Sequence, residues 1–272
     1  REILKTIIIP LWNAYSFYVT YANIDKMSPE SQPEDPSNPL DRWVLSEAER
    51  LVEEVTAGLD EYEMQRAIDP IVGFIDLLNN WYIRRSRRRF WKSESDADKR
   101  DAYATLYNVL VKLVTVAAPI IPFITESIYR NLRAEGAPAS VHLCDYPVAD
   151  RSKRDTDLEK KMSVTREAVR LGRAIRSMHN LKTRQPLKAI HLVTRNDSER
   201  RILLEMEDII REELNVKDVV FRENEEDLVE FSAKANYRLL GRELGKDMKA
   251  AAARIEELTA NEIQSLLEGN IL

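Results

Sequence analysis

The feature that most constrains the fold is the helical spacing of apolar residues in the first half of the chain. Between positions 41 and 62, five apolar residues recur three or four positions apart: Leu45, Ala48, Leu51, Val55 and Leu59. This spacing places them on one face of an α-helix, which must be buried against other elements. A second such stretch covers residues 100–117. The sequence therefore predicts a protein built mainly from packed helices.

Prolines and polar loops divide residues 1–150 into separate helices. Prolines punctuate the stretch 25–39, and Pro119 and Pro122 interrupt a later one. Because proline breaks helices and short connections favour neighbouring placement, we expect an antiparallel bundle of about five helices. The expected helices cover residues 2–24, 41–62, 64–92, 100–117 and 123–134.

Residues 151–272 follow a different pattern, which predicts a second domain. A long amphipathic helix is expected over residues 157–179. Short strand candidates then alternate with helices, which is typical of a small α/β unit. The strands are expected at 188–194, 216–221 and 228–235, and the helices at 198–204, 206–214, 242–253 and 259–268.

Composition limits the class of protein. With 272 residues, of which 44% are hydrophobic, the chain can bury a substantial core. No apolar run approaches the ~20 residues that a membrane span requires. The single cysteine, Cys144, excludes an internal disulfide and a cysteine-rich zinc site, so a cytoplasmic location is expected. Because residue 1 is Arg and no signal peptide follows, we expect an internal piece of a longer protein.

The segment Asn79–Lys92, called the arginine segment below, is the strongest functional signal. It holds six cations, four aromatic rings and no acid, in a chain whose net charge is −5. On a helix, Arg84 and Arg88 are neighbours that repel each other, and so are Arg85 and Arg89. An anionic partner would turn this repulsion into attraction, because guanidinium groups grip phosphates. The pattern indicates a helix that faces RNA, although a charge run can also serve solubility alone.

The aromatic rings of the arginine segment have two interpretations. Trp81, Tyr82, Phe90 and Trp91 could anchor the helix in the core, as aromatic residues at helical spacing commonly do. One or two of them could instead stack on a base. We therefore treat Trp81 and Trp91 as candidate RNA contacts beside Arg84, Arg85, Arg87, Arg88, Arg89 and Lys92.

A second basic region surrounds the sequence Asn180–Leu187, called the basic loop below. Residues 170–188 carry six cations and no acid, whereas acids dominate residues 205–230. Pro186 favours an extended conformation at Gln185, so nearby cations should project from a loop. Phosphate contact and an ordinary polar connector both fit this loop. Its candidate contacts are Arg176, Lys182, Arg184 and Lys188.

Signals for catalysis are few. His142, His179 and His191 lie far apart without the spacing of metal ligands, and there is no glycine-rich phosphate loop. No carboxylate sits in an apolar context typical of a general acid or base. We expect this chain to be non-catalytic alone, with no catalytic, cofactor-binding or metal-binding residues.

Six motifs follow one another along the chain: Leu11–Ile24, Asp41–Leu45, Asn80–Trp91, Ala118–Glu126, Val141–Pro147 and Asn180–Leu187. Together they resemble the part of isoleucyl-tRNA synthetases that follows the catalytic region, in the form found in eukaryotes, archaea and some bacteria. Valyl- and leucyl-tRNA synthetases share the Asn-Trp-Tyr and Ala-Pro-x-x-Pro-Phe elements, whereas the elements at 141–147 and 180–187 favour isoleucine.

The resemblance implies a class Ia anticodon-binding domain that contacts tRNA for isoleucine, in an enzyme that joins isoleucine to tRNA. ATP and Mg would act in a catalytic domain outside this chain, and the editing domain would also lie outside it. Lys26-Met27-Ser28 is similar to half of the Lys-Met-Ser-Lys-Ser signature, but Pro29 and Glu30 follow, so we treat it as chance. Many bacterial members end in a cysteine-rich zinc element, which one cysteine cannot form. A monomer is expected.

Three alternatives stay open on the sequence. The chain could be the same part of a valyl- or leucyl-tRNA synthetase. It could bind structured RNA without reading an anticodon. It could also be a helical module that docks an acidic protein, or pairs with its own acidic region at residues 205–230.

Overall fold

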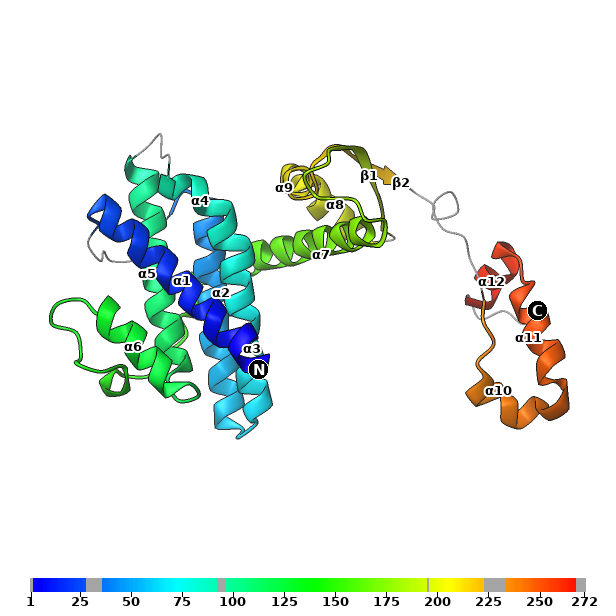
Figure 1. Ribbon diagram of the computed structural model, residues 1–272, viewed down its shortest axis with the longest axis horizontal. Coiled ribbons are helices and arrows are strands. Elements are labelled where there is room, and N and C mark those ends of the chain that lie inside the picture. The colour runs from blue at the N-terminus through cyan, green and yellow to red at the C-terminus, as the bar shows by residue number, and fades with distance from the viewer. Residues whose placement is uncertain (1, 28–35, 92–95, 195, 223–232, 268–272) are drawn as a thin grey trace. The chain divides into compact units, whose positions relative to one another are not determined.

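The chain divides into two compact units, Arg1–Val164 and Thr165–Leu272. The computed structural model describes residues 2–27, 36–91, 96–194, 196–222 and 233–267. Figure 1 shows helices in the first unit, and helices with two short strands in the second. This arrangement confirms the predicted fold class, a mainly helical protein with a bundle followed by a small α/β part. The predicted functional division at residue 150 stays a prediction.

All five helical stretches expected in the first unit are present. The stretch that carries the arginine segment is a continuous helical run of three parts, whose middle part is a π-helical turn, and a second π-helical turn begins the first helix. The elements are η1 (Leu4–Ile8), α1 (Ile9–Asp25), α2 (Pro39–Asp60), α3 (Met64–Leu77), η2 (Leu78–Ile83), α4 (Arg84–Trp91), α5 (Asp96–Ala117) and α6 (Pro122–Leu132). Two short 3-10 turns follow, η3 (Val141–Leu143) and η4 (Arg151–Lys153).

Local signals explain where these helices begin. The Asn38 side chain accepts a hydrogen bond from the Leu40 amide at 3.0 Å, and Pro39 occupies the first helical position of α2. Asparagine caps and first-turn prolines both favour a helix start, so α2 begins two residues before the expected Asp41. Pro122 likewise opens α6.

One hydrophobic core holds the first unit together. Helices α2 and α3 are joined by only three residues, 61–63, so they pack as an antiparallel pair. Large side chains from different helices are fully buried between them, with Trp43 from α2, Tyr82 from η2 and Leu106 from α5 each 0% exposed. Burying one such side chain contributes about 1.5–3 kcal/mol. The bundle therefore fixes which side of the arginine segment faces inward.

The α/β part contains a parallel strand pair. Helix α7 (Thr156–Met178) is followed by β1 (Leu187–Val193), α8 (Asp197–Glu205), α9 (Glu207–Leu214) and β2 (Val216–Arg222). Leu187 lies opposite Val216 and Val193 opposite Arg222, in parallel. Parallel strands need a crossover connection, which α8 and α9 provide. A Cβ atom at Gly172 of α7 would lie 2.5 Å from Leu214 Cδ1, so glycine permits this close packing.

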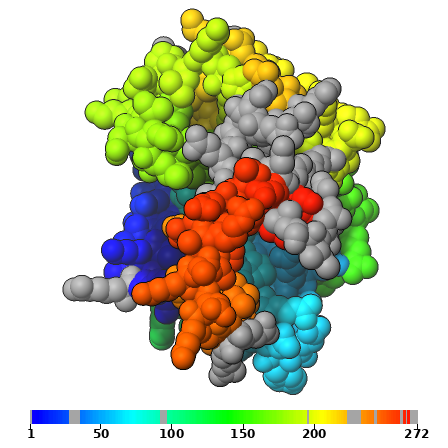
Figure 2. Space-filling view, turned by 90° about the vertical axis from the view of Figure 1, so that its right-hand side faces the viewer, coloured from blue at the N-terminus to red at the C-terminus, as the bar shows by residue number. Residues whose placement is uncertain are grey.

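The tail is helical, as expected, and forms a group of its own. It comprises α10 (Tyr237–Leu244), η5 (Gly245–Asp247), α11 (Met248–Glu256) and α12 (Ala260–Leu267). Figure 2 shows these helices in orange and red, and the ion pair of Arg254 with Glu262, at 3.2 Å, joins the last two. Of the third expected strand, residues 228–232 lie outside the described residues, and residues 233–235 are not a strand.

Candidate nucleic-acid interface

Three of the four rings in the arginine segment point into the core. Trp81 is 6% exposed, Tyr82 is 0% and Phe90 is 1%. Phe90 packs edge-on against Phe17 of α1 and Tyr103 of α5, with ring centroids 5.1 and 4.9 Å apart. Trp91 differs, since it is 53% exposed. The inward rings therefore anchor the segment, and Trp91 is the ring available to a ligand.

Arg89 is an internal arginine. Its two terminal nitrogens donate to both carboxylate oxygens of Asp41 at 2.7 Å each. Its Nε donates to the Asp98 carboxylate at 3.0 Å, and a terminal nitrogen reaches the Asp98 carbonyl at 3.1 Å. Tyr82 donates to the same Asp41 carboxylate at 2.7 Å. Arg89 thus joins α4 to α2 and α5, and this pairing occupies the guanidinium that would otherwise meet a phosphate.

The electrostatics agree with this role. Burial alone would lower the pKa of Arg89, but hydrogen bonds to Asp41 and Asp98 raise the pKa above its usual value. Burial raises the pKa of Tyr82 well above its usual value, and the adjacent Asp41 charge adds to the effect. The cluster therefore favours a charged arginine beside a neutral tyrosine.

The remaining arginines of the segment lie nearer to solvent. Arg84 is half-buried, with its guanidinium carbon 5.9 Å from the centroid of the Trp81 ring and its Nε donating to the Asn80 carbonyl at 2.7 Å. Arg85 is also half-buried. Arg87 and Arg88 are exposed. Lys92 lies outside the described residues. The outward face of α4 therefore presents Arg87, Arg88 and Trp91.

The basic loop is organised around a buried arginine, Arg176. Arg176 is 4% exposed, and its guanidinium donates to four main-chain carbonyls. Two belong to the loop itself, those of Lys182 and Gln185, each at 3.0 Å. The other two belong to Leu214, at 2.6 Å, and Asn215, at 3.3 Å. These contacts fix the loop against the start of β2 and turn Arg176 inward.

The other candidate residues of the basic loop face solvent. Asn215 has a left-handed backbone conformation, with φ of 50°. Its side chain donates to the carbonyls of Thr183 and Arg184 at 3.1 Å each. These bonds hold the main chain of the loop, while the side chains of Lys182, Arg184 and Lys188 are exposed. These three cations can bind an anionic partner.

Sequence reasoning missed the residues that divide the cations into inward and outward groups. Asp41 and Asp98 lie 48 and 9 positions from Arg89, and Asn215 lies 39 positions from Arg176. No spacing rule links such positions, because the bundle and the strand pair bring them together. The one available signal was the position of Asp41, two residues before Trp43 at the start of an apolar helix, since an acid buried at such a place requires a partner.

Across the described ranges, no three His, Cys, Asp or Glu side chains are grouped so that they could hold a metal ion. No helix among these residues is long and apolar enough to cross a membrane.

Comparison with known proteins identifies a family. Residues 41–191, more than half of the chain, match the family described as the anticodon-binding domain of tRNA ligase. Over its whole length the chain is 55% identical to an isoleucine–tRNA ligase of Treponema denticola. It is 44% identical, over 97% of its length, to an isoleucine–tRNA ligase of Protochlamydia amoebophila, and 42% identical, over 98%, to one of Chlamydia pneumoniae. The chain spans 26% of the length of each of these relatives.

Proposed function

Because the chain belongs to the family of anticodon-binding domains of tRNA ligases, we propose that it binds tRNA through the outward face of α4 and through the basic loop. The observation that carries this proposal is that the arginines of the segment divide into exposed and buried ones. Arg87 and Arg88 are exposed on one side of α4, while Arg89 is held inward by Asp41. A face of exposed guanidinium groups suits the phosphates of a folded RNA.

The proposal assigns different tasks to the candidate residues. The exposed cations contact phosphates directly, and Trp91 stacks on a base. Arg84 and Arg85 lie at the edge of the same face and add to its positive charge. Trp81, Arg89 and Arg176 act as positioning residues, because each is largely buried. The exposed cations are Arg87, Arg88, Lys182, Arg184 and Lys188.

The proposal also covers the protein of which this chain is a part. Its relatives are isoleucine–tRNA ligases of about four times the length, so we assign the chain to a ligase that joins isoleucine to its tRNA isoacceptors. ATP and Mg belong to the catalytic part of such a protein, and the present chain contributes RNA binding without catalysis. We also propose that the protein is cytoplasmic and monomeric.

A titration with three RNAs tests the proposal. The chain would be titrated with isoleucine tRNA, valine tRNA and an unrelated RNA hairpin at two salt concentrations. We expect tighter binding to isoleucine tRNA, weakened by salt because phosphate contacts release counterions. Equal, salt-sensitive binding to all three would indicate a non-decoding RNA protein. Absence of binding would favour a module that docks an acidic protein.

A further inference from the structure

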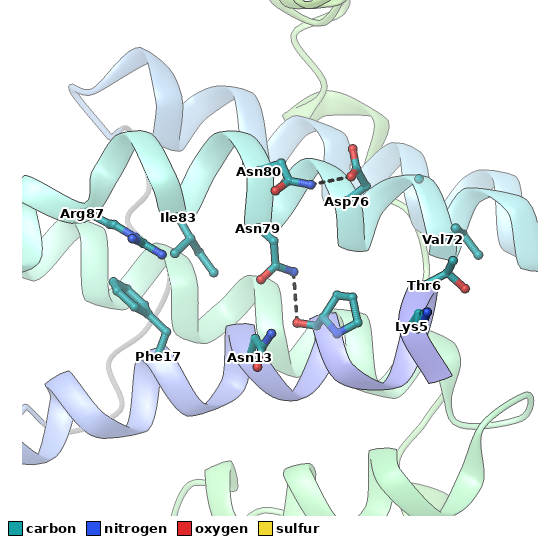
Figure 3. Close-up of a pocket in the computed structure, with 12 residues that line it drawn as sticks. Lys5, Thr6, Asn13, Phe17, Val72, Asp76, Asn79, Asn80, Ile83 and Arg87 are labelled. Atoms are coloured by element: carbon teal, nitrogen blue, oxygen red, sulfur yellow. Dashed lines mark hydrogen bonds between the residues drawn. The ribbon is translucent and has the colours of Figure 1, made fainter. Parts of the chain in front are cut away.

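A groove of about 700 Å³ lies in the first unit, between α1 with its π-helical start and the continuous run from α3 to α4. Figure 3 shows its residues in order along the groove: Arg87 and Phe17 lie at one end, Lys5, Thr6 and Val72 at the other, and Asn13 and Asn79 between them. Its volume falls in the range of small-molecule sites, about 300–1,000 Å³. The groove is therefore large enough to hold a small organic group.

The two π-helical turns of the first unit both line this groove. Lys5 and Thr6 come from η1, and Asn79, Asn80 and Ile83 come from η2. The Asn79 side chain donates to the Pro10 carbonyl at 3.1 Å and to the Ile75 carbonyl at 2.9 Å, which ties η2 to the first turn of α1. Such turns strain a helix and commonly mark functional sites.

The residues that line the groove differ in charge between its ends and its middle. Cations stand at both ends, while the middle carries amides and one carboxylate, Asp76, which accepts a hydrogen bond from Asn80 Nδ2 at 2.6 Å. Asn13 is exposed, and within the described ranges its amide makes no hydrogen bond. A phosphate in the middle would be repelled by Asp76, whereas an uncharged ring with donors and acceptors on its edge would find complementary groups there.

We propose that this groove binds one unpaired nucleotide of the tRNA. The base lies in the middle, where Asn13 and the Asp76–Asn80 pair read its edge and Phe17 offers a ring for stacking. The phosphate lies at the end where Arg87 stands, next to the outward face of α4. This inference rests on the proposed function, and it assigns base reading to a groove between α1 and the run from α3 to α4, apart from the exposed cations Arg88, Lys182 and Arg184.

A plug in the groove provides the test. Gly73 lines the groove, and a Cβ atom there meets no other heavy atom within 4 Å, so Gly73→Trp can fill the groove without a clash at its base. Gly241→Trp is the matched control, since it lies in α10 with equally open space at its Cβ atom. Circular dichroism would establish that both variants fold as the wild type does.

The readout pairs these variants with an isoleucine tRNA transcript in which each unpaired nucleotide is replaced in turn by an abasic one. We expect Gly73→Trp to weaken binding of the intact transcript by about 5- to 150-fold, the range for one stacked base. The salt slope should stay unchanged, because Gly73 follows Val72 at the end of the groove opposite Arg87, so the phosphate contact at Arg87 is kept. One abasic position should weaken wild-type binding similarly and have no further effect in Gly73→Trp.

Three other outcomes separate the two proposals. If the wild type binds the transcript with salt dependence, and Gly73→Trp binds as tightly as Gly241→Trp, the groove assignment is wrong and the proposed function stands. If every abasic effect is additive with the plug, the assignment also fails. If the wild type shows no salt-dependent binding, the proposed function itself fails. Should Gly73→Trp misfold, Asn13→Ala replaces it, with Thr20→Ala on the same helix as control.

Discussion

The arginine segment and the basic loop use the same division of labour with different means. Each is ordered by one buried arginine, Arg89 in the segment itself and Arg176 in α7 next to the loop, and each presents exposed cations to solvent. Arg89 is held by the carboxylates of Asp41 and Asp98, while Arg176 is held by four main-chain carbonyls. In the arginine segment, the positive charge of Arg89 is compensated by two carboxylates inside the helical bundle. In the basic loop, the guanidinium of Arg176 donates hydrogen bonds to carbonyls of an irregular backbone.

Because of this division, some arginines of the same run contribute to the stability of the protein, and others are free of that role and are available for binding. Neighbouring arginines such as Arg88 and Arg89 have opposite roles, because one is exposed and the other is buried against an acid. Replacing the inward residue should lower the stability of the protein, and replacing the outward one should only weaken its interaction with RNA. Each prediction below tests one side of this division.

The largest effect is expected for Arg89→Ala. This change leaves the fully buried Asp41 without its cation, which should lower the free energy of unfolding by about 3–5 kcal/mol. Urea unfolding followed by tryptophan fluorescence measures it, since Trp12, Trp43, Trp81 and Trp91 all lie in the first unit. Arg88→Ala, the control, should change the free energy by less than about 0.5 kcal/mol. Equal losses in the two variants would refute the division.

A smaller loss is expected for Arg176→Ala. The buried bond to the Leu214 carbonyl and the two bonds to the loop would be lost, which should cost about 1.5–3 kcal/mol. Hydrogen exchange should speed up at the amides of residues 181–185 and 187, because the loop loses its anchor. In Arg184→Ala the same amides should exchange at the wild-type rate. Faster exchange in that control alone would reverse the assignment.

The outward residues of the basic loop should affect binding alone. In Lys182→Ala/Arg184→Ala, the slope of log affinity against log salt should fall by about one for each lost phosphate contact. The urea midpoint should stay at the wild-type value, because both side chains are exposed. A binding titration at four salt concentrations gives the slope. A double variant with wild-type slope would remove the basic loop from the interface.

The smallest effect concerns an ion pair of intermediate burial. Burial opposes ionisation of Glu159, but hydrogen bonds from Arg154, at 2.6 and 3.1 Å, and from Ser46 lower the pKa of this carboxyl below 4.5. Its stabilising contribution is therefore complete above pH 4.5 and is lost as the pH falls through the folded-state pKa. Glu159→Gln should be less stable than the wild type at pH 7, and the difference should shrink in acid. A constant difference from pH 7 to pH 3 would exclude the linkage.

The sequence predicted the elements well, because they depend on local patterns. Helical spacing of apolar residues located the bundle helices, and alternation of strand and helix patterns indicated the strands β1 and β2, whose parallel pairing the structure adds. The predicted helix starts were less accurate where a capping residue sets the first turn. Asn38 caps α2, so this helix begins at Pro39 and not at the expected Asp41. The third strand candidate failed where the structure describes it, since residues 233–235 form no strand.

The candidate site was predicted only as a set of cations. Charge and aromatic content marked the arginine segment, but the inward turn of Arg89 depends on Asp41, which lies in another helix. The groove beside α1 was not foreseen at all. It depends on two π-helical turns, Leu4–Ile8 and Leu78–Ile83, neither of which the sequence predicted.

The measurement that tests the central claim most directly is the salt dependence of tRNA binding by Arg87→Ala/Arg88→Ala. Both guanidinium groups are exposed on α4, so the account predicts an unchanged free energy of unfolding and a salt slope smaller by about two, one for each phosphate contact. Arg89→Lys serves as the comparison, since it should lower stability while the slope stays constant. A wild-type slope in the double variant would contradict the claim that the outward arginines hold the RNA.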